Sequence, residues 1–494
     1  MHERPPDSGR RRPAGGVSAV SSRPALVAID LGAESCRVSL LQWQGDSPAI
    51  RMVHRFANGP ITEGQSVRWD LDRICRELDH GLRQCAELAS EGIASIGVTG
   101  WAVDYVRLDP QGQPFAQPYC YRDARTQDAM AEVHARIGAE RLYSIAGVQI
   151  QPINTVYQLY ADKLSGIPSS MPWVNLPEYI LHWLGAPRVG EYTNASHTAL
   201  VDTTTEQWSS EVFAALGLDR AAAPEIVSPG TVLGPVKNHL RALPAFAQTQ
   251  LIAPACHDTA SAIAAIATQD NTWAYISSGT WSLVGTLLPS SHKTPDACHL
   301  GFTNLGAATG DILFHRGIPG MWLLRQCMNV WEETTPCSVE SMIEEAQKLP
   351  QPGYALHLDD ESFLLPGHMP ERINAQLRAR GIAPLPPGCD AAPRYANLIF
   401  HSLADRYAAL LRSLHTMTGK SLDCICVVGG GSRNEFLNAL TSQAARVPVQ
   451  RCSAESSTLG NFAVQWARLE HASQPIDAAL LTPYARQLTA VVPQ

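Results

Sequence analysis

Several features that mark other classes of protein are missing from this chain. No apolar run reaches the roughly 18 residues that a membrane-spanning helix needs, so no membrane partner is expected. Basic residues are in deficit, with a formal net charge of -8 and a pI near 6.1, which argues against a nucleic-acid partner. The twelve cysteines form no CxxC pair, which disfavours a metal site. With no signal peptide, free thiols fit a reducing cytoplasm, so a cytoplasmic location is predicted.

The composition that remains is that of an ordinary globular protein. Hydrophobic residues make up 45% of the 494 residues and charged residues 17%. A chain of this length is too long for one hydrophobic core and is typical of two or three domains. The first 23 residues combine arginines with Pro, Gly and Ser and lack an apolar segment, so residues 1–23 are predicted to be a disordered tail.

The pattern after the tail predicts two related α/β domains. Strands and helices alternate along the chain, and an apolar run from Leu26 to Asp30, a small turn from Gly32 to Ser35 and a second apolar run together indicate a hairpin. The segment 273–285 repeats this pattern, which indicates a duplicated domain. We place the boundary near residue 267, giving an N-terminal domain over 24–267 and a C-terminal domain over 268–485.

Three turns of small residues indicate a nucleotide site. The turns of the two hairpins expose backbone N–H groups that can hold phosphates, although an ordinary hairpin turn also explains either one alone. The third turn, Gly429-Gly430-Gly431, follows an apolar strand and precedes a helix from about Asn434, an order typical of nucleotide contact. All three in one chain favour a nucleotide. Asp30, at the end of the first strand, can hold Mg²⁺ through water or serve as a turn carboxylate.

Asp258 is the candidate catalytic residue, at the start of a helix of small residues. One interpretation makes it an N-cap that accepts N–H bonds from the first turn. The other makes it a carboxylate at a cleft that takes a proton from a sugar hydroxyl. The neighbouring His257 either binds a sugar hydroxyl or is a satisfied buried histidine. Trp101 can stack on a sugar face or belong to the core, and Asp104 can accept sugar hydroxyls.

Taken together, these segments resemble the FGGY family of carbohydrate kinases, and within it the rhamnulokinase branch. The resemblance covers roughly residues 26–470 and is carried by AIDLGAESCRV, IGVTGWAVDYVRLDPQGQPFAQPYCYRDART, HDTASAIAAI, YISSGTWSLVG, VVGGGSRNEFLNAL and ESSTLGN. It implies two actin-like (ribonuclease-H-like) domains with a ligand cleft between them, holding ATP and Mg²⁺. It also implies transfer of the γ-phosphoryl group to a primary hydroxyl of a small-molecule ketose. L-rhamnulose is the leading candidate for this substrate.

The resemblance assigns roles to individual residues. Asp258 is the catalytic base that it implies. The sugar contacts it implies are Ala102, His257, Thr259 and the position of Gly317. The nucleotide contacts it implies are Ala33, Glu34, Ser35, Cys36, Arg37, Thr280, Arg325, Gly430 and Gly431.

Four of these positions depart from the rhamnulokinase pattern. Cys36 and Ala102 stand where glycines are expected, Gly317 where an Asn contacts the sugar, and Arg325 where a Gln lies near the nucleotide. Losing a polar partner changes sugar choice strongly, so L-fuculose or another ketose or polyol stays an alternative. A non-catalytic, nucleotide-dependent sugar sensor is the alternative from another class. The chain is expected to be a monomer or a homodimer.

Overall fold

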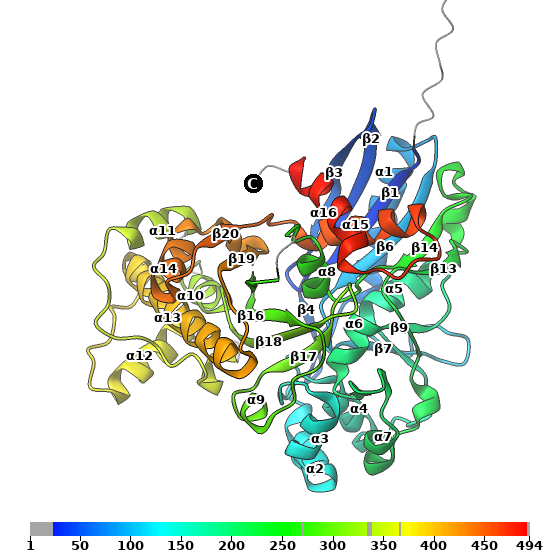
Figure 1. The fold of residues 1–494 in the computed structure, drawn as a ribbon. Helices are drawn as coiled ribbons and strands as arrows, with labels where there is room; N and C mark the ends of the chain where they lie inside the picture. Colours follow the sequence, from blue (N-terminus) through cyan, green and yellow to red (C-terminus); the bar gives the residue numbers. More distant parts are fainter. Residues whose placement is uncertain (1–22, 269–270, 333–337, 365–366, 492–494) are drawn as a thin grey trace, which may run out of the picture.

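The computed structural model describes residues 23–268, 271–332, 338–364 and 367–491. Within these residues the chain forms two lobes, each built around a six-stranded sheet (Figure 1). The α/β class predicted from the sequence is confirmed. The prediction of a disordered tail over 1–23 falls, except for Arg23, outside the described residues.

The first sheet has the strand order β13-β14-β6-β1-β2-β3. Strands β14, β6 and β1 run parallel, while β2, β3 and β13 pair antiparallel with their neighbours. All seven residues of β1 are buried, because helices pack on both faces of this sheet. The strands are β1 (Ala25–Leu31), β2 (Ser35–Gln44), β3 (Ser47–Ala57), β6 (Ile93–Gly100), β13 (Thr231–Pro235) and β14 (Gln250–Ala253).

The second sheet has the order β17-β18-β16-β15-β19-β20. Strands β15, β19 and β20 are parallel, and β16 and β18 follow β15 antiparallel. The strands are β15 (Trp273–Ser278), β16 (Trp281–Leu288), β17 (Thr303–Gly306), β18 (Ile312–Pro319), β19 (Cys424–Val428) and β20 (Val449–Arg451).

The two sheets repeat one topology. Read as β14-β6-β1-β2-β3 and β20-β19-β15-β16-β18, they have the same chain order and the same alternation of parallel and antiparallel pairs. The predicted hairpins are β1–β2 and β15–β16, at equivalent places in the two sheets. The duplication predicted from the two hairpins is therefore confirmed.

Helices and four small two-stranded sheets complete the lobes. In the first lobe the helices are α1 (Leu71–Leu88), α2 (Thr126–Ile137), α3 (Ala139–Ala146), α4 (Thr155–Leu164), α5 (Leu176–Leu184), α6 (Tyr192–Ala195), α7 (Ser210–Leu216) and α8 (Asp258–Ala264). The small strands are β4 (Pro60–Glu63), β5 (Ser66–Trp69), β7 (Tyr105–Arg107), β8 (Trp173–Asn175), β9 (Val189–Glu191), β10 (Val201–Asp202), β11 (Gln207–Trp208) and β12 (Glu225–Val227).

The later helices are α9 (Pro295–His299), α10 (Trp322–Glu332), α11 (Val339–Gln347), α12 (Met369–Ala379), α13 (Ala392–Thr418), α14 (Glu435–Ala445), α15 (Ser456–Glu470) and α16 (Ala478–Ala490). Local sequence explains several of their ends. Helix α1 starts where Asp70 accepts the N–H of Arg73, and its buried residues Ile74, Leu78 and Leu82 recur at the spacing of one helical face. The long helix α13 ends at Gly419, whose φ of 67° is left-handed.

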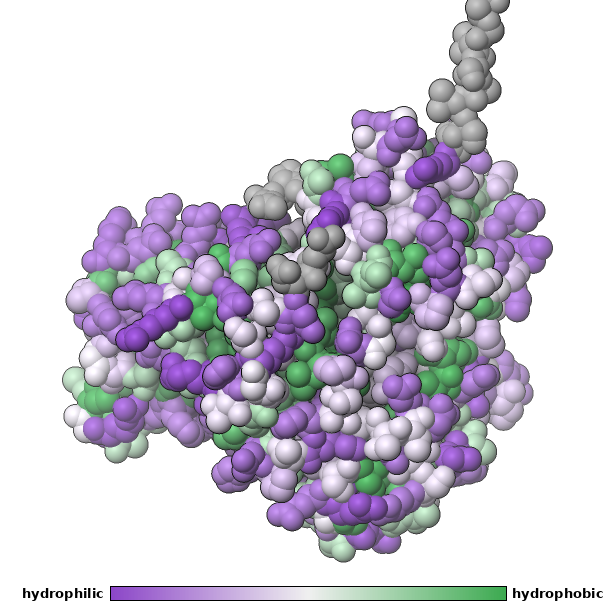
Figure 2. Space-filling view, in the orientation of Figure 1, coloured by the Kyte–Doolittle hydropathy of each residue, from purple (hydrophilic) through white to green (hydrophobic). Residues whose placement is uncertain are grey.

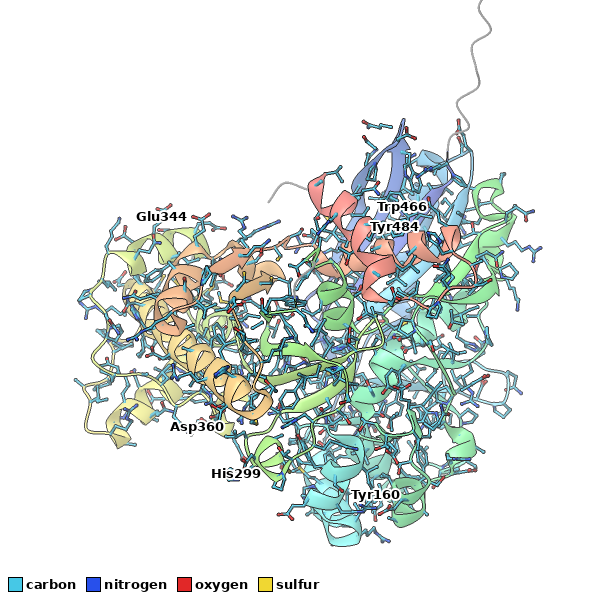
Figure 3. All side chains as sticks on the ribbon, viewed as in Figure 1. Tyr160, His299, Glu344, Asp360, Trp466 and Tyr484 are labelled. Atoms are coloured by element: carbon cyan, nitrogen blue, oxygen red, sulfur yellow. The ribbon has the colours of Figure 1, made fainter. Side chains whose placement is uncertain are left out.

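The last two helices return to the first lobe, whereas the sequence placed residues up to 485 in the second domain. Helix α15 lies against β1, where the Gln465 side chain donates to the carbonyl of Val27 at 3.0 Å. Trp466 of α15 and Tyr484 of α16, both labelled in Figure 3, pack with ring centroids 5.1 Å apart. Trp43 of β2 contacts Trp466 edge-on. The chain therefore crosses between the lobes a second time just before α15.

The surface in Figure 2 is mostly hydrophilic, with apolar residues in small patches on the face shown. Large exposed hydrophobic side chains, such as Met52 and Phe115, are scattered. Among the described residues, no helix combines the length and the apolar character needed to cross a bilayer.

Candidate active site

The first half of the site lies where three neighbouring parallel strands of the first sheet end. Asp30 is near the end of β1, Trp101 follows β6, and Asp258 follows β14 after four residues. Gly100 forms a bridge with His257, and its N–H donates to the carbonyl of Cys256 at 2.9 Å. Ligands of α/β sheets bind outside the carboxyl ends of parallel strands, so these residues occupy the expected edge.

The equivalent edge of the second sheet carries the two other small-residue turns. The β15–β16 turn contains Gly279 and Thr280, and Gly429 to Gly431 follow β19. A Cβ atom added to Gly431 would lie 2.0 Å from the Ser278 hydroxyl oxygen, so this glycine lets the two turns pack together. A Cβ added to Gly430 would meet nothing within 4 Å. Gly430 therefore presents open backbone for a ligand.

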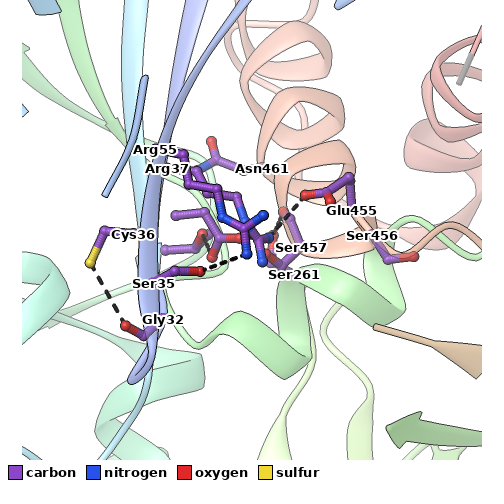
Figure 4. A network of polar contacts seen from close by, with 12 residues as sticks. Gly32, Ser35, Cys36, Arg37, Arg55, Ser261, Glu455, Ser456, Ser457 and Asn461 are labelled. Carbon is purple, nitrogen blue, oxygen red and sulfur yellow. Dashed lines mark hydrogen bonds and ion pairs between the residues drawn. The ribbon is translucent and has the colours of Figure 1, made fainter. Parts of the chain in front are cut away.

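The two halves meet across the lobes at the turns of the two hairpins. The Thr280 hydroxyl donates to Glu34 Oε1 at 3.2 Å, joining the turn of the second hairpin to that of the first. Arg37 on β2 donates to Asp30 Oδ2 at 3.0 Å. It also donates to Glu455 Oε2 at 2.9 Å, and Arg37 and Glu455 are both labelled in Figure 4. Since Glu455 precedes α15, one guanidinium ties the end of β1 to the segment that returns from the second lobe.

Asp258 is the first residue of α8 and not its N-cap, which is His257. The N-cap interpretation is therefore wrong. The Asp258 side chain remains 37% exposed, and the Thr259 hydroxyl donates to its Oδ1 at 3.2 Å. Loss of hydration within the protein, and then the negative charge of Asp30, raise the pKa of Asp258 to about 7. A carboxyl with a pKa near neutrality and an open face suits general-base work.

His257 lies deep beside Asp258, with Nε2 3.5 Å from Asp258 Oδ1. Burial, and then the nearby His315, lower its pKa to about 3, so the ring is neutral. Its Nδ1 is buried and lacks a hydrogen-bond partner among the described residues. Buried polar atoms are normally satisfied, so this nitrogen favours a ligand contact over a purely structural role. Thr259 is also buried.

The loop after β6 is held in a strained conformation. Val103 has a φ of 71°, which is rare for a β-branched residue, and Thr155 holds its carbonyl with a 2.7 Å hydrogen bond. Trp101 and Ala102 are nearly buried, and the Trp101 ring lies 4.4 Å from that of Trp69. Strain held by surrounding contacts is typical of functional loops.

Asp104 does not face a sugar, in contrast to the prediction. It is fully buried, and its carboxylate accepts bonds from four donors: the indoles of Trp69 and Trp101, the side chain of Gln158 and the N–H of Tyr121. Burial raises its pKa to about 6. Its acceptors are engaged, so Asp104 positions Trp101 instead.

At the turn of the first hairpin, the Cys36 side chain lies in the core. Alternation along β2 turns Cys36 into the core, where it is fully buried, whereas Ser35 and Arg37 lie on the opposite face. Burial raises the pKa of the Cys36 thiol to about 12. Gly32 permits the turn, since an added Cβ would lie 2.5 Å from the Ser35 carbonyl oxygen. Cys36 can therefore offer a phosphate only its backbone, as can Ala33.

Gly317 and Arg325 lie on β18 and α10 of the second lobe. Gly317 is buried on β18, and its N–H donates to Gln149 Oε1 at 3.3 Å. Arg325 is exposed on α10 and lies 3.6 Å from Glu332. Neither Gln149 nor Glu455 was predicted, because both reach the site from segments that are distant in sequence. For Glu455, its place at the head of ESSTLGN was an available signal.

The chain matches two family models in succession. Residues 25–265 match the N-terminal domain, and residues 274–468 the C-terminal domain, of the FGGY family of carbohydrate kinases. The boundary predicted near residue 267 falls in the interval between them.

Curated relatives and solved structures agree with this match. The chain is 34% identical to a rhamnulokinase of Enterococcus faecalis, covering 89% of this chain and 88% of that protein. It is 36% identical to a rhamnulokinase of Pectobacterium carotovorum, covering 89% and 87%. The fold is similar to gluconate kinase from Lactobacillus acidophilus, with a TM-score of 0.72, 16% identity and coverage of 95% and 97%. Plasmodium falciparum glycerol kinase with ADP gives a TM-score of 0.71 at 14% identity, covering 94% and 92%.

Proposed function

The chain belongs to the FGGY family of carbohydrate kinases, and from that premise we propose that it phosphorylates L-rhamnulose with ATP, giving L-rhamnulose 1-phosphate. Membership sets aside the sugar-sensor alternative, since the matched family consists of kinases. The choice of L-rhamnulose rests on three relatives described as rhamnulokinases at 33–36% identity.

Asp258 carries the mechanistic part of the proposal. Its carboxyl group stands at the carboxyl edge of the first sheet, partly exposed, with a pKa of about 7. In the proposed reaction it accepts the proton of the attacking primary hydroxyl as that oxygen bonds to the γ-phosphorus. The same contact aims the oxygen in line, which matters because positioning dominates phosphoryl transfer.

The sugar is proposed to lie between Asp258 and the loop after β6. His257 offers its unpartnered Nδ1, Thr259 its hydroxyl, and Trp101 and Ala102 an apolar wall. A neutral His257 can exchange hydrogen bonds with sugar hydroxyls without adding charge to the site.

The nucleotide is proposed to span the two hairpin turns and the glycine turn. Backbone groups from Ala33 to Ser35 and the Thr280 hydroxyl suit the phosphates, and the open backbone at Gly430 suits the adenosine. Arg37 would exchange one of its two carboxylate partners for a phosphate oxygen.

Asp30 fits a role in holding Mg²⁺. Magnesium in phosphotransfer sites is held by one or two carboxylates together with substrate phosphates and water. The charge of Asp30 raises the pKa of Asp258, and a divalent cation held by Asp30 would reduce that repulsion. When bound, Mg²⁺ neutralises charge on the phosphates.

A second sugar remains a candidate because of Gly317. Leu283 and Gln149 line the space beside this glycine: a Cβ added to Gly317 would lie 3.1 Å from Leu283 Cδ2 and 3.5 Å from Gln149 Oε1. The wall there is therefore made by residues other than the one expected at position 317. This change favours keeping L-fuculose and other ketoses or polyols as alternatives.

The test is a coupled ATP-consumption screen with L-rhamnulose, L-fuculose, D-xylulose, gluconate and glycerol. The proposal requires the highest kcat/KM with L-rhamnulose. A higher value with another substrate replaces L-rhamnulose as the substrate, and Gly317→Asn is then expected to shift preference toward L-rhamnulose. No turnover with any of them contradicts the proposal. The cytoplasmic location and the state of monomer or homodimer remain predictions.

A further inference from the structure

Helix α8 starts with the proposed base but has little local support. It has seven residues, and its N-cap His257 makes no side-chain capping hydrogen bond. Helix α8 packs against α15, so the direction of Asp258 depends on that packing and on the segment in front of α8, which includes Cys256 and His257. A small displacement of a reacting group from its productive geometry is costly for catalysis.

Buried side chains at the start of helix α6 hold the two backbone N–H groups of that segment. The Cys256 N–H donates to Glu191 Oε2 at 2.7 Å, and the His257 N–H donates to Thr193 Oγ1 at 3.2 Å. The Thr193 hydroxyl in turn donates to Glu191 Oε2 at 2.5 Å, and the Thr193 N–H to Glu191 Oε1 at 2.9 Å. Glu191 and Thr193 are fully buried. The Glu191 carboxyl group therefore holds the Cys256 N–H directly and the His257 N–H through the Thr193 hydroxyl.

A second buried carboxyl group fixes the first. The Glu191 N–H donates to Glu178 Oε1 at 3.0 Å, and Asn194 Nδ2 donates to Glu178 Oε2 at 2.9 Å. Strand β9, which ends at Glu191, pairs with β12 outside the two large sheets. The large sheet does not hold Glu191 in place, and Glu178 on α5 fixes its backbone instead.

We propose that Glu191 is a positioning residue for Asp258, acting through the Cys256–His257 backbone. The inference rests on the role proposed for Asp258 above. Glu191 does not touch the reacting atoms; it fixes the peptide from which α8 begins, while Gly100 holds the Cys256 carbonyl from the other side.

Glu191→Gln is the informative substitution. Donors reach both oxygens of Glu191, from Thr193 N–H on Oε1 and Cys256 N–H on Oε2. A carboxyl group can accept both whether or not it carries a proton, whereas an amide has one acceptor and one N–H₂ group. One backbone N–H therefore loses its partner. We expect kcat to fall about 10- to 100-fold, with KM for ATP changed less than about twofold, as displacement of a catalytic group predicts.

A merely structural role predicts a different pattern. Ser209→Ala removes a buried N-cap from α7 in the same lobe and serves as the matched control. This variant is expected to lower the melting temperature and to keep the wild-type kcat. In the Asp258→Asn background, Glu191→Gln is expected to cause no further loss of the residual rate, because it acts through Asp258. A full further loss in that background, or wild-type kcat in Glu191→Gln, overturns the proposal.

Two further variants keep the outcome decisive. If Glu191→Gln does not fold, Thr193→Val removes only the hydroxyl that holds the His257 N–H, and an unchanged kcat there overturns the proposal. Asp258→Asn measured alone separates the two ideas. High activity in that variant defeats the base assignment itself, whereas an inactive Asp258→Asn with a normal Glu191→Gln defeats only the role of Glu191.

Discussion

Replacing Asp258 by Asn tests the proposed chemistry most directly. Asn keeps the size of the side chain and an oxygen that can accept the Thr259 hydroxyl, but it cannot take a proton at neutral pH. Loss of a general base costs about 100- to 10,000-fold in rate, or about 2.7–5.4 kcal/mol of transition-state stabilisation. We therefore expect kcat to fall by two to four orders of magnitude, roughly.

The structure predicts that the fold survives this change. His257, and not Asp258, is the N-cap of α8, so no capping bond is lost. Removing a negative charge from the first turn of a helix costs about 0.3–1 kcal/mol. Loss of the repulsion from Asp30 acts in the opposite direction. The net change in the free energy of unfolding is expected to stay within about 1 kcal/mol.

The assay couples ADP release to NADH oxidation and is run beside calorimetric titrations with ATP and with the sugar. Asp128→Asn is the matched control, because Asp128 is an exposed acidic residue in the first turn of α2, away from the site. The control is expected to keep wild-type kcat. Near-normal turnover in Asp258→Asn with both ligands bound would refute the reasoning, and another group would have to take the proton.

Two further predictions concern the glycine turn and the pH dependence of stability. Gly431→Ala is expected to destabilise the second lobe, because its Cβ would collide with Ser278, while Gly430→Ala folds normally and weakens ATP binding; equal melting temperatures for the two variants would contradict this. Burial raises the pKa of Glu178 to about 7 and of Glu191 to about 8, above the usual 4.5, so the folded state holds protons that the unfolded chain releases. The stability these groups give is complete below about pH 4.5 and is lost as pH rises toward 8. The buried histidines, whose lowered pKa values act the other way, affect stability only below about pH 6.5. The urea concentration at the unfolding midpoint should therefore decrease as the pH is raised from 6.5 to 8. An increase over this pH range would exclude this account.

Local patterns in the sequence predicted the strands and turns of the site. The apolar runs that became β1, β15 and β19 stand where they were expected, as do the turns that follow them. Apolar runs and small-residue turns depend on neighbours in the chain, so a local pattern suffices to find them. The same patterns, repeated in the second half, predicted the duplicated topology.

Side-chain direction and the exact start of a helix were less predictable from the sequence. Asp104 was expected to bind sugar but accepts hydrogen bonds from four donors in the core. The Cys36 side chain points into the core, so the phosphate contact predicted there stays a prediction for its backbone alone. Asp258 was open to two interpretations until the backbone showed that the helix is capped one residue earlier. Each outcome depends on what packs against the residue, which the local sequence does not contain.

By itself, the sequence determined the α/β class, the two hairpins, the glycine turn and the place of Asp258 at the start of a helix of small residues. Only the tertiary structure decided that α15 and α16 return to the first lobe, that Arg37 meets Glu455, and that Glu191 lies against Cys256. These pairs are separated by tens to hundreds of residues, and they form because parallel strands and returning helices bring distant segments to one edge of a sheet. Secondary structure is set largely by near neighbours, whereas an active site is set by contacts that exist only after the chain has folded.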